Sequence, residues 1–153
     1  MSTRRGGSTG HTVTDLHKSI ITMIRGLSYF VRDKLYLAVT NQVNSVTSIQ
    51  ARGPGFEWGS KFVKLSSEPT PQDLYVAVTD AFEKNLIKVD SMEADEITFA
   101  GYGEPLLRYD VIAEASKLIK ESHHGVPLRV KTNGLIETGV ASNVALELKE
   151  AGM

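Results

Sequence analysis

The sequence predicts an α/β domain built on a parallel sheet. Short apolar segments with strand-like composition, at residues 35–40, 96–99 and 128–132, alternate with segments of helical periodicity. Strands and helices that alternate with short connections are typical of parallel sheets with right-handed crossovers. The length of 153 residues corresponds to one domain, and a hydrophobic content of 41% is enough for an ordinary apolar core.

The first residues differ in composition from the rest of the chain. Residues 1–12 are rich in Gly, Ser and Thr and contain almost no apolar side chain, so we expect a disordered tail. This tail carries Arg4 and Arg5 and precedes the first acidic residue, Asp15. Arginine and serine without acid also resemble an organelle transit peptide. A cytoplasmic location is therefore expected, with organelle targeting by the tail as the alternative.

An N-terminal helix is expected within residues 13–27. Its apolar residues fall on one stripe at helical spacing: Leu16, Ile20, Ile21 and Ile24. Residues 29–31 and 35–40 then read as a hairpin, because only three polar residues separate them. The following segment, residues 41–69, shows no clear period and contains a loop rich in Gly and Pro.

Three helices are predicted after this loop. The helix over residues 71–88 has clear start signals, since Thr70 is a good N-cap and Pro71 suits the first helical position. The other two helices are expected over residues 110–122 and 140–150. Apolar residues continue on one face of the first helix, and the second has several of its own: Val111, Ile112, Ala115, Leu118 and Ile119.

Composition excludes several functional classes. The 17 basic and 18 acidic side chains give a net charge of −1, which argues against a nucleic-acid partner. No apolar run approaches the roughly 18 residues of a membrane span, so no membrane partner is expected. The absence of cysteine excludes a disulfide scaffold, a thiolate zinc site, a cysteine nucleophile and a cysteine-ligated iron–sulfur cluster.

Polar, glycine-rich segments follow the predicted strands at residues 40–50, 100–105 and 132–135. Ligands of parallel α/β folds bind beyond the carboxyl ends of the strands. The second segment holds the most informative motif, Gly101-Tyr102-Gly103-Glu104-Pro105. Its glycines let a ligand approach the backbone, and Glu104 offers a carboxylate to an ammonium group. The alternative is a strand-to-helix turn with a solvated Glu104.

Two other polar groups have simpler explanations. Thr132 and Asn133 either bind a ligand or, with Gly134, form only a turn. His123 and His124 stand where a helix is expected to end, and interaction with the helix C-terminus and solvent explains them better than metal binding.

The strand-end motifs resemble those of the radical SAM superfamily. Residues 35–43 are similar to the family's first strand and its entry into the cluster loop. Residues 99–105 resemble the second-strand motif, whose glycines and glutamate contact the amino end of S-adenosylmethionine. Residues 129–135 resemble the third strand with its Thr-Asn-Gly end. The closest subgroup is the TatD-associated radical SAM proteins, for which Tyr-Gly-Glu-Pro after Phe-x-Gly is typical.

The resemblance covers about residues 28–153 and implies a partial TIM-like barrel of about three strand–helix units. The family form has six such units, so we expect a domain incomplete at its C-terminus: a fragment, a truncated isoform or a subunit completed by association. Open sheet edges would then pair with a second copy or another chain. The resemblance also implies a small-molecule site for S-adenosylmethionine, formed by Gly101, Tyr102, Gly103, Glu104, Pro105, Thr132 and Asn133.

One departure from the family pattern concerns its four-iron–four-sulfur cluster. Val43, Thr47 and Gln50 stand where the family has the three cysteines of Cys-x3-Cys-x2-Cys. Valine has no ligating atom, and neutral Thr and Gln replace a thiolate poorly. We therefore expect a degenerate iron–sulfur site with no metal ligand and no catalytic residue, inactive in radical chemistry.

The expected function is then at most weak binding of an S-adenosylmethionine-type ligand. Three alternatives stay open. The domain is a structural or interaction module that uses its open sheet edge, it is a fragment of a radical SAM family enzyme, or it is an unrelated doubly wound nucleotide-binding fold.

Overall fold

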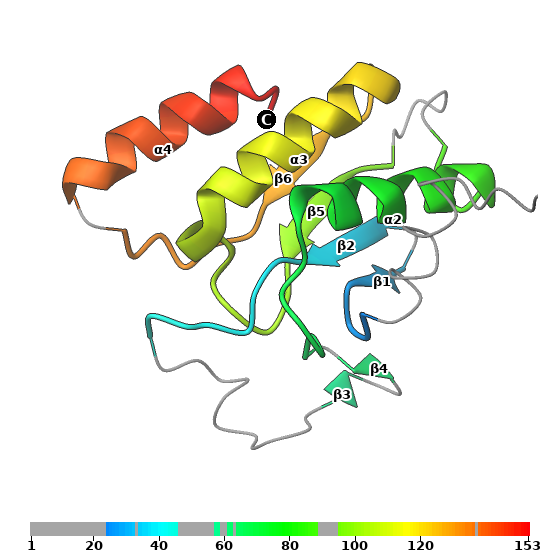
Figure 1. Cartoon of the computed structure of the whole chain (residues 1–153), viewed down its shortest axis with the longest axis horizontal. Coiled ribbons are helices and arrows are strands. Elements are labelled where there is room, and N and C mark those ends of the chain that lie inside the picture. The colour runs from blue at the N-terminus through cyan, green and yellow to red at the C-terminus, as the bar shows by residue number, and fades with distance from the viewer. Residues whose placement is uncertain are drawn as a thin grey trace, which may run out of the picture.

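The computed structural model describes residues 24–32, 34–45, 57–58, 61–62, 64–88, 95–136 and 138–153. This part of the chain is a mixed α/β structure with a four-stranded open sheet and three α-helices (Figure 1). The expected disordered tail of residues 1–12 lies outside the described residues. The expected helix within residues 13–27 also lies outside them up to residue 23, and residues 24–27 form bends and turns. Among the described helices, none has the length and apolar character needed to cross a lipid bilayer.

The four strands of the sheet lie in the order β1-β2-β5-β6. β1 (Ser28–Val31) and β2 (Lys34–Ala38) are antiparallel and form the predicted hairpin, with Arg32 in its turn at φ 54°. β5 (Ile97–Ala100) pairs parallel with β2, and β6 (Leu128–Val130) pairs parallel with β5. The predicted parallel arrangement of the three main strands is confirmed.

A small hairpin, which was not predicted, lies in the segment without a clear period. β3 (Glu57–Trp58) and β4 (Lys61–Phe62) pair antiparallel and form a two-stranded sheet of their own. Two residues per strand are too few for hydrophobic alternation to be visible in the sequence.

The helix α2 (Pro71–Glu83) begins as predicted and ends earlier. Thr70 caps it, and the Thr70 hydroxyl and the Asp73 carboxylate bond each other's backbone N–H in a capping box. The predicted end at residue 88 is wrong, because Asn85 adopts a left-handed conformation at φ 54° that stops the helix. Ile87 is nevertheless buried, which explains why the apolar pattern continued past the helix.

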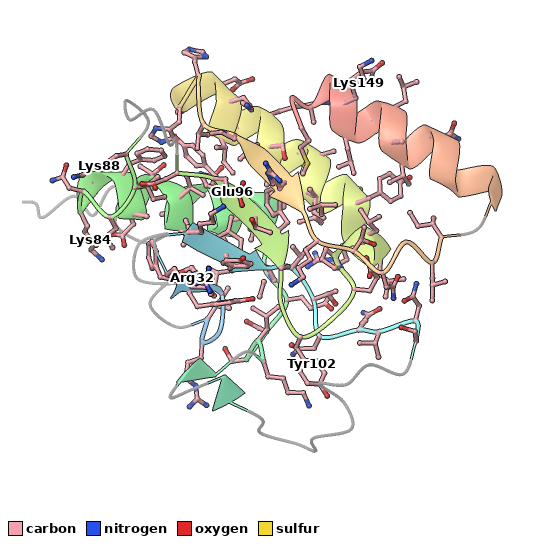
Figure 2. The ribbon with its side chains drawn as sticks, turned by 180° about the vertical axis from the view of Figure 1, so that it is seen from behind. Arg32, Lys84, Lys88, Glu96, Tyr102 and Lys149 are labelled. Atoms are coloured by element: carbon pink, nitrogen blue, oxygen red, sulfur yellow. The ribbon has the colours of Figure 1, made fainter. Side chains whose placement is uncertain are left out.

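The other two helices agree with the prediction within two residues. A short 3-10 helix at Pro105–Arg108 leads directly into α3 (Tyr109–Ser122), and α4 (Thr138–Glu150) follows β6. All three α-helices cover one face of the sheet, and the other face is seen from behind in Figure 2. The domain is therefore a two-layer structure in its described part.

The core lies between the helices and this face of the sheet. The register places Leu35, Ile97 and Leu128 side by side, followed by a second row of Leu37, Phe99 and Val130. Phe99 and Leu37 are fully buried, and burial of each side chain stabilises the fold by roughly 1.5–3 kcal/mol. Ile112, Ala115 and Ile119 of α3 are equally buried in the same cluster. The apolar rows thus hold the strands in register.

The opposite face of the sheet carries aromatic and charged residues. The rings of Tyr29 and Tyr36 stack at 5.4 Å, and burial, with a contribution from Tyr36, raises the pKa of Tyr29 to about 12. Glu96 forms ion pairs with Lys34 and Arg129, each at 2.7 Å. The hydrogen bond from Lys34 and then the charges of Arg129 and Lys34 lower the pKa of Glu96, against an opposing effect of burial. These pairs connect β2, β5 and β6 at their amino ends.

We predict that the stability of the fold falls at mildly acidic pH because of His123. Its ring stacks on Phe82 at 4.1 Å, between α2 and the end of α3, and its Nε2 atom is buried without a partner among the described residues. Burial lowers the pKa of His123 below its ordinary value of 6.5. The unfolded chain therefore takes up a proton first as the pH falls through about 6.5, and the free energy of unfolding decreases from there downward.

Urea unfolding between pH 7.5 and 5 measures this effect. We expect His123→Gln to weaken the pH dependence, while the matched change at the exposed His124 leaves it unaltered. Identical pH slopes for the wild type and His123→Gln would contradict the assignment.

Candidate functional site

The loop after β5 lies against the segment that follows β2. The backbone N–H of Gly103 donates to the Thr40 carbonyl at 3.1 Å, and that of Glu104 donates to the Gln42 carbonyl at 2.8 Å. A Cβ at Gly103 would overlap the carbonyl oxygens of Thr40 and Gln42, so this position needs glycine for close approach of two backbones. The second glycine of the motif, Gly101, has φ 131° and lies against Ala38. The presence of glycine at both positions of the motif is therefore explained by close contacts within the protein.

Glu104 connects the loop after β5 with the loop after β6. Its Oε1 accepts hydrogen bonds from the Leu106 N–H at 3.0 Å and from the Thr132 hydroxyl at 2.7 Å. Its Oε2 accepts from the Asn133 N–H at 2.8 Å. The residue is only 6% exposed, so the expectation of a solvated Glu104 is wrong, whereas the expected strand-to-helix turn is present, with Glu104 capping the 3-10 helix that follows. The three donors are neutral, and within the described residues Glu104 has no cationic partner.

The loop after β6 also reaches the segment after β2. The Asn133 side-chain amide donates to Asn44 Oδ1 at 2.8 Å and to Ser45 Oγ at 3.0 Å. In return, the Asn44 amide donates to the Leu135 carbonyl at 2.6 Å. Gly134 at φ 72° provides the turn that brings these groups together. The structure thus joins the three predicted strand-end segments in one network through residues 40–45, 103–104 and 132–135.

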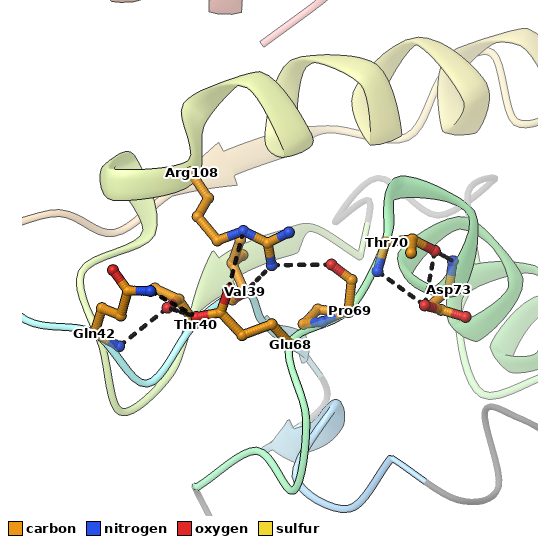
Figure 3. Close-up of polar contacts among 8 residues, drawn as sticks. All are labelled: Val39, Thr40, Gln42, Glu68, Pro69, Thr70, Asp73 and Arg108. Carbon is orange, nitrogen blue, oxygen red and sulfur yellow. Dashed lines mark hydrogen bonds and ion pairs between the residues drawn. The ribbon is translucent and has the colours of Figure 1, made fainter.

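A second polar cluster, drawn in Figure 3, was not predicted from the sequence. Arg108 donates from Nη1 to the carbonyls of Val39 and Pro69, both at 2.9 Å, and pairs with Glu68 at 3.5 Å. The Glu68 carboxylate also accepts from the hydroxyl of the buried Thr40 at 2.5 Å and from the Gln42 amide at 3.3 Å. Arg108 therefore connects the end of β2 with the start of α2. No local pattern in the sequence could indicate a contact over 39 or 69 residues.

The segment before α2 is held at the same edge by Asn41. Its side-chain amide bonds both backbone groups of the buried Leu65, donating to the carbonyl at 2.8 Å and accepting from the N–H at 2.9 Å. The neighbouring Lys64 places its Nζ over the ring of Tyr102, 4.9 Å from the centroid. Tyr102 lies beyond the carboxyl end of β5, as Figure 2 shows.

The predicted cluster positions are only partly described. Val43 is half-buried on the segment after β2, and Thr47 and Gln50 lie outside the described residues. Valine offers no donor atom, and the chain contains no cysteine. Among the described residues no group of three or more His, Asp or Glu side chains is placed to hold a metal ion. The residues present therefore do not fit a thiolate-held cluster.

The edge retains two kinds of group for a small ligand. Glu104 places a carboxylate just behind the loop, and this carboxylate forms no ion pair within the described part of the chain. The carbonyls of Gly101 and Tyr102 accept no hydrogen bond from the described residues, and both residues are half-exposed. Pro105 is buried at the start of the 3-10 helix and directs the chain away from the edge. Such a site favours a cation with N–H donors.

The chain was compared with known protein families, curated proteins and solved structures. Neither the protein-family models, nor the curated proteins, nor the solved structures contain a match to this chain.

We predict that Glu104→Gln destabilises the fold. In either orientation of the introduced amide, its NH₂ group faces a backbone N–H, that of Leu106 or that of Asn133, and one donor loses its acceptor. The expected decrease in the free energy of unfolding is about 1–3 kcal/mol in urea denaturation.

The control for this prediction is Glu121→Gln, the same chemical change at an exposed position of α3. We expect it to change the stability by less than about 0.5 kcal/mol. An equally small effect at Glu104 would mean that the carboxylate does not hold the two loops together.

Proposed function

We propose that this chain is a radical SAM-like domain that binds an S-adenosylmethionine-type ligand weakly at the carboxyl edge of its sheet and has no radical chemistry. The observation that carries the proposal is the buried Glu104 carboxylate. It lies behind a half-exposed glycine loop and has only neutral hydrogen-bond partners among the described residues. Its negative charge attracts a ligand that carries positive charge, as S-adenosylmethionine does at its ammonium and sulfonium groups.

The arrangement of the sheet supports a barrel-type scaffold. β2, β5 and β6 are neighbours in the same order as along the chain, and all three α-helices lie on one face (Figure 1). A TIM-like barrel keeps its strands in sequential order, with the helices on the outside. One half of a doubly wound fold has the same arrangement, because its strand order reverses only between the two halves. We favour the partial TIM-like barrel because the three strand-end motifs at residues 35–43, 99–105 and 129–135 resemble the radical SAM family.

In this proposal the residues of the edge act by binding and orientation. The carbonyls of Gly101 and Tyr102 accept hydrogen bonds from the ligand ammonium, and the charge of Glu104 strengthens that contact. Thr132 and Asn133 hold the carboxylate in place through the hydrogen bonds described above. Two carbonyls on half-exposed residues are a small set of contacts, which is why the proposed affinity is low.

The iron–sulfur cluster of the family has no part in the proposed function. Three thiolates on three irons are the chemistry that the family loop supplies, and Val43, Thr47 and Gln50 supply none. No catalytic residue is assigned, and no reaction step follows from the residues of the edge.

Isothermal titration with S-adenosylmethionine tests the binding proposal. We expect a dissociation constant of about 1 mM for the wild-type chain. Folded Glu104→Gln should give a smaller heat, whereas the Glu121→Gln control should bind like the wild type. Absence of heat at millimolar ligand would remove the binding proposal. It would leave the interaction module, which the edge position of β6 in the described sheet favours.

Anaerobic reconstitution with iron and sulfide tests the loss of the cluster. We expect no visible charge-transfer absorption from the wild-type chain after desalting, because no thiolate is present to bind iron. The triple variant Val43→Cys, Thr47→Cys, Gln50→Cys restores the family ligands and serves as the comparison. A stoichiometric cluster in the wild-type chain would contradict the proposal.

A further inference from the structure

Tyr102 presents an aromatic face that already holds a cation. It stands between the two glycines of the loop after β5, is half-exposed, and carries the Lys64 Nζ 4.9 Å from its ring centroid. Attraction between a cation and the face of an aromatic ring extends to about 6 Å. Lys64 has no hydrogen bond or ion pair from its ammonium group to any described residue. The ring of Tyr102 is therefore its one partner within the described part of the chain.

The two positive groups of S-adenosylmethionine need different partners. Its ammonium has N–H donors and suits the carbonyls of the loop and the charge of Glu104. Its sulfonium carries a charge but no donor, so hydrogen-bond acceptors have no proton to bind. An aromatic face attracts such a cation by its quadrupole, as it does quaternary ammonium groups. Tyr102 and Glu104 are two residues apart on the same loop, so both kinds of partner are present at this edge.

We propose that Tyr102 is the specificity-determining residue that recognises the sulfonium cation, and that Lys64 occupies its place in the free chain as an internal competitor. This inference rests on the proposed function and names the group of the ligand that the site distinguishes. The backbone beside Lys64 is fixed, because Asn41 bonds both main-chain groups of Leu65. Its flexible side chain can leave the ring without unfolding the loop.

An internal competitor lowers the apparent affinity of the site. The ligand binds only the fraction of molecules in which the ring is free, so removal of the lysine ammonium strengthens binding. A contact of this kind at an exposed site corresponds to a change of about two- to five-fold in affinity. The same competition explains in part why the wild-type chain binds weakly.

The test is a double-mutant cycle by isothermal titration of the full chain. The four proteins are the wild type, Lys64→Met, Tyr102→Leu and the double variant, each checked for folding by circular dichroism. Two probes are used: S-adenosylmethionine, and S-adenosylhomocysteine, which has the ammonium but no sulfonium charge. Lys117→Met removes an exposed lysine of α3 and is the matched control for a general change in net charge.

We expect Lys64→Met to bind S-adenosylmethionine about two- to five-fold more tightly and S-adenosylhomocysteine unchanged. Tyr102→Leu should bind S-adenosylmethionine more weakly, and in its background Lys64→Met should give no gain, because the ring for which the lysine competes is absent. Lys117→Met should bind like the wild type.

A gain from Lys64→Met that persists without Tyr102, or that is equal for both probes, would overturn the sulfonium assignment while leaving the proposed binding function standing. Binding by the wild type that neither Lys64→Met nor Tyr102→Leu changes would also overturn the sulfonium assignment and leave the proposed binding function standing. Absence of heat for all four proteins would overturn the proposed function itself.

Discussion

The hydrogen bonds of the Glu104 carboxylate are the interaction on which the carboxyl edge of the sheet depends. They join loops that are 28 and 29 residues apart in the chain, and they use both carboxylate oxygens. The segment after β2 is attached to both loops. Its backbone carbonyls accept hydrogen bonds from the N–H groups of Gly103 and Glu104, and its Asn44 and Ser45 side chains accept from the Asn133 amide. Three strand ends are thus held as one surface. Among the described residues, the buried carboxylate is hydrogen-bonded to neutral donors alone.

A glutamate at such an edge has one of two roles: it contacts a ligand directly, or it holds the loop that does. A glutamate that binds a ligand ammonium directly needs a carboxylate oxygen that the ligand can reach, whereas Glu104 is buried and already accepts three hydrogen bonds. In the proposed function it therefore acts on a ligand through its charge and through the loop that it holds. Direct contact is proposed for the carbonyls of Gly101 and Tyr102 and for the ring of Tyr102, because both residues are half-exposed. The proposed site is consequently rigid at its base and open at its surface.

The helical layer explains how so small a sheet is held in shape. Rows of apolar residues on one face of β2, β5 and β6 pack against the helices, while ion pairs of Glu96 connect the amino ends on the other face. Arg108 completes the attachment at the carboxyl end, because its guanidinium joins the end of β2 to the start of α2 (Figure 3). The two ends of the strands are therefore fixed by polar contacts and their centres by burial.

The sequence by itself determined the elements whose signals are local. Thr70 and Pro71 placed the start of α2, and the apolar runs placed β2, β5 and β6. The glycines of the motif were expected to admit a ligand, whereas the structure shows that Gly103 admits the backbone of the segment after β2. The sequence also determined the absence of thiolates at positions 43, 47 and 50. Only the tertiary structure decided that Asn85 ends α2 early, that Glu104 is buried, and that Lys64 lies over Tyr102. Capping and periodicity act over one or two turns, whereas burial and long-range contacts depend on which segments the completed sheet brings together.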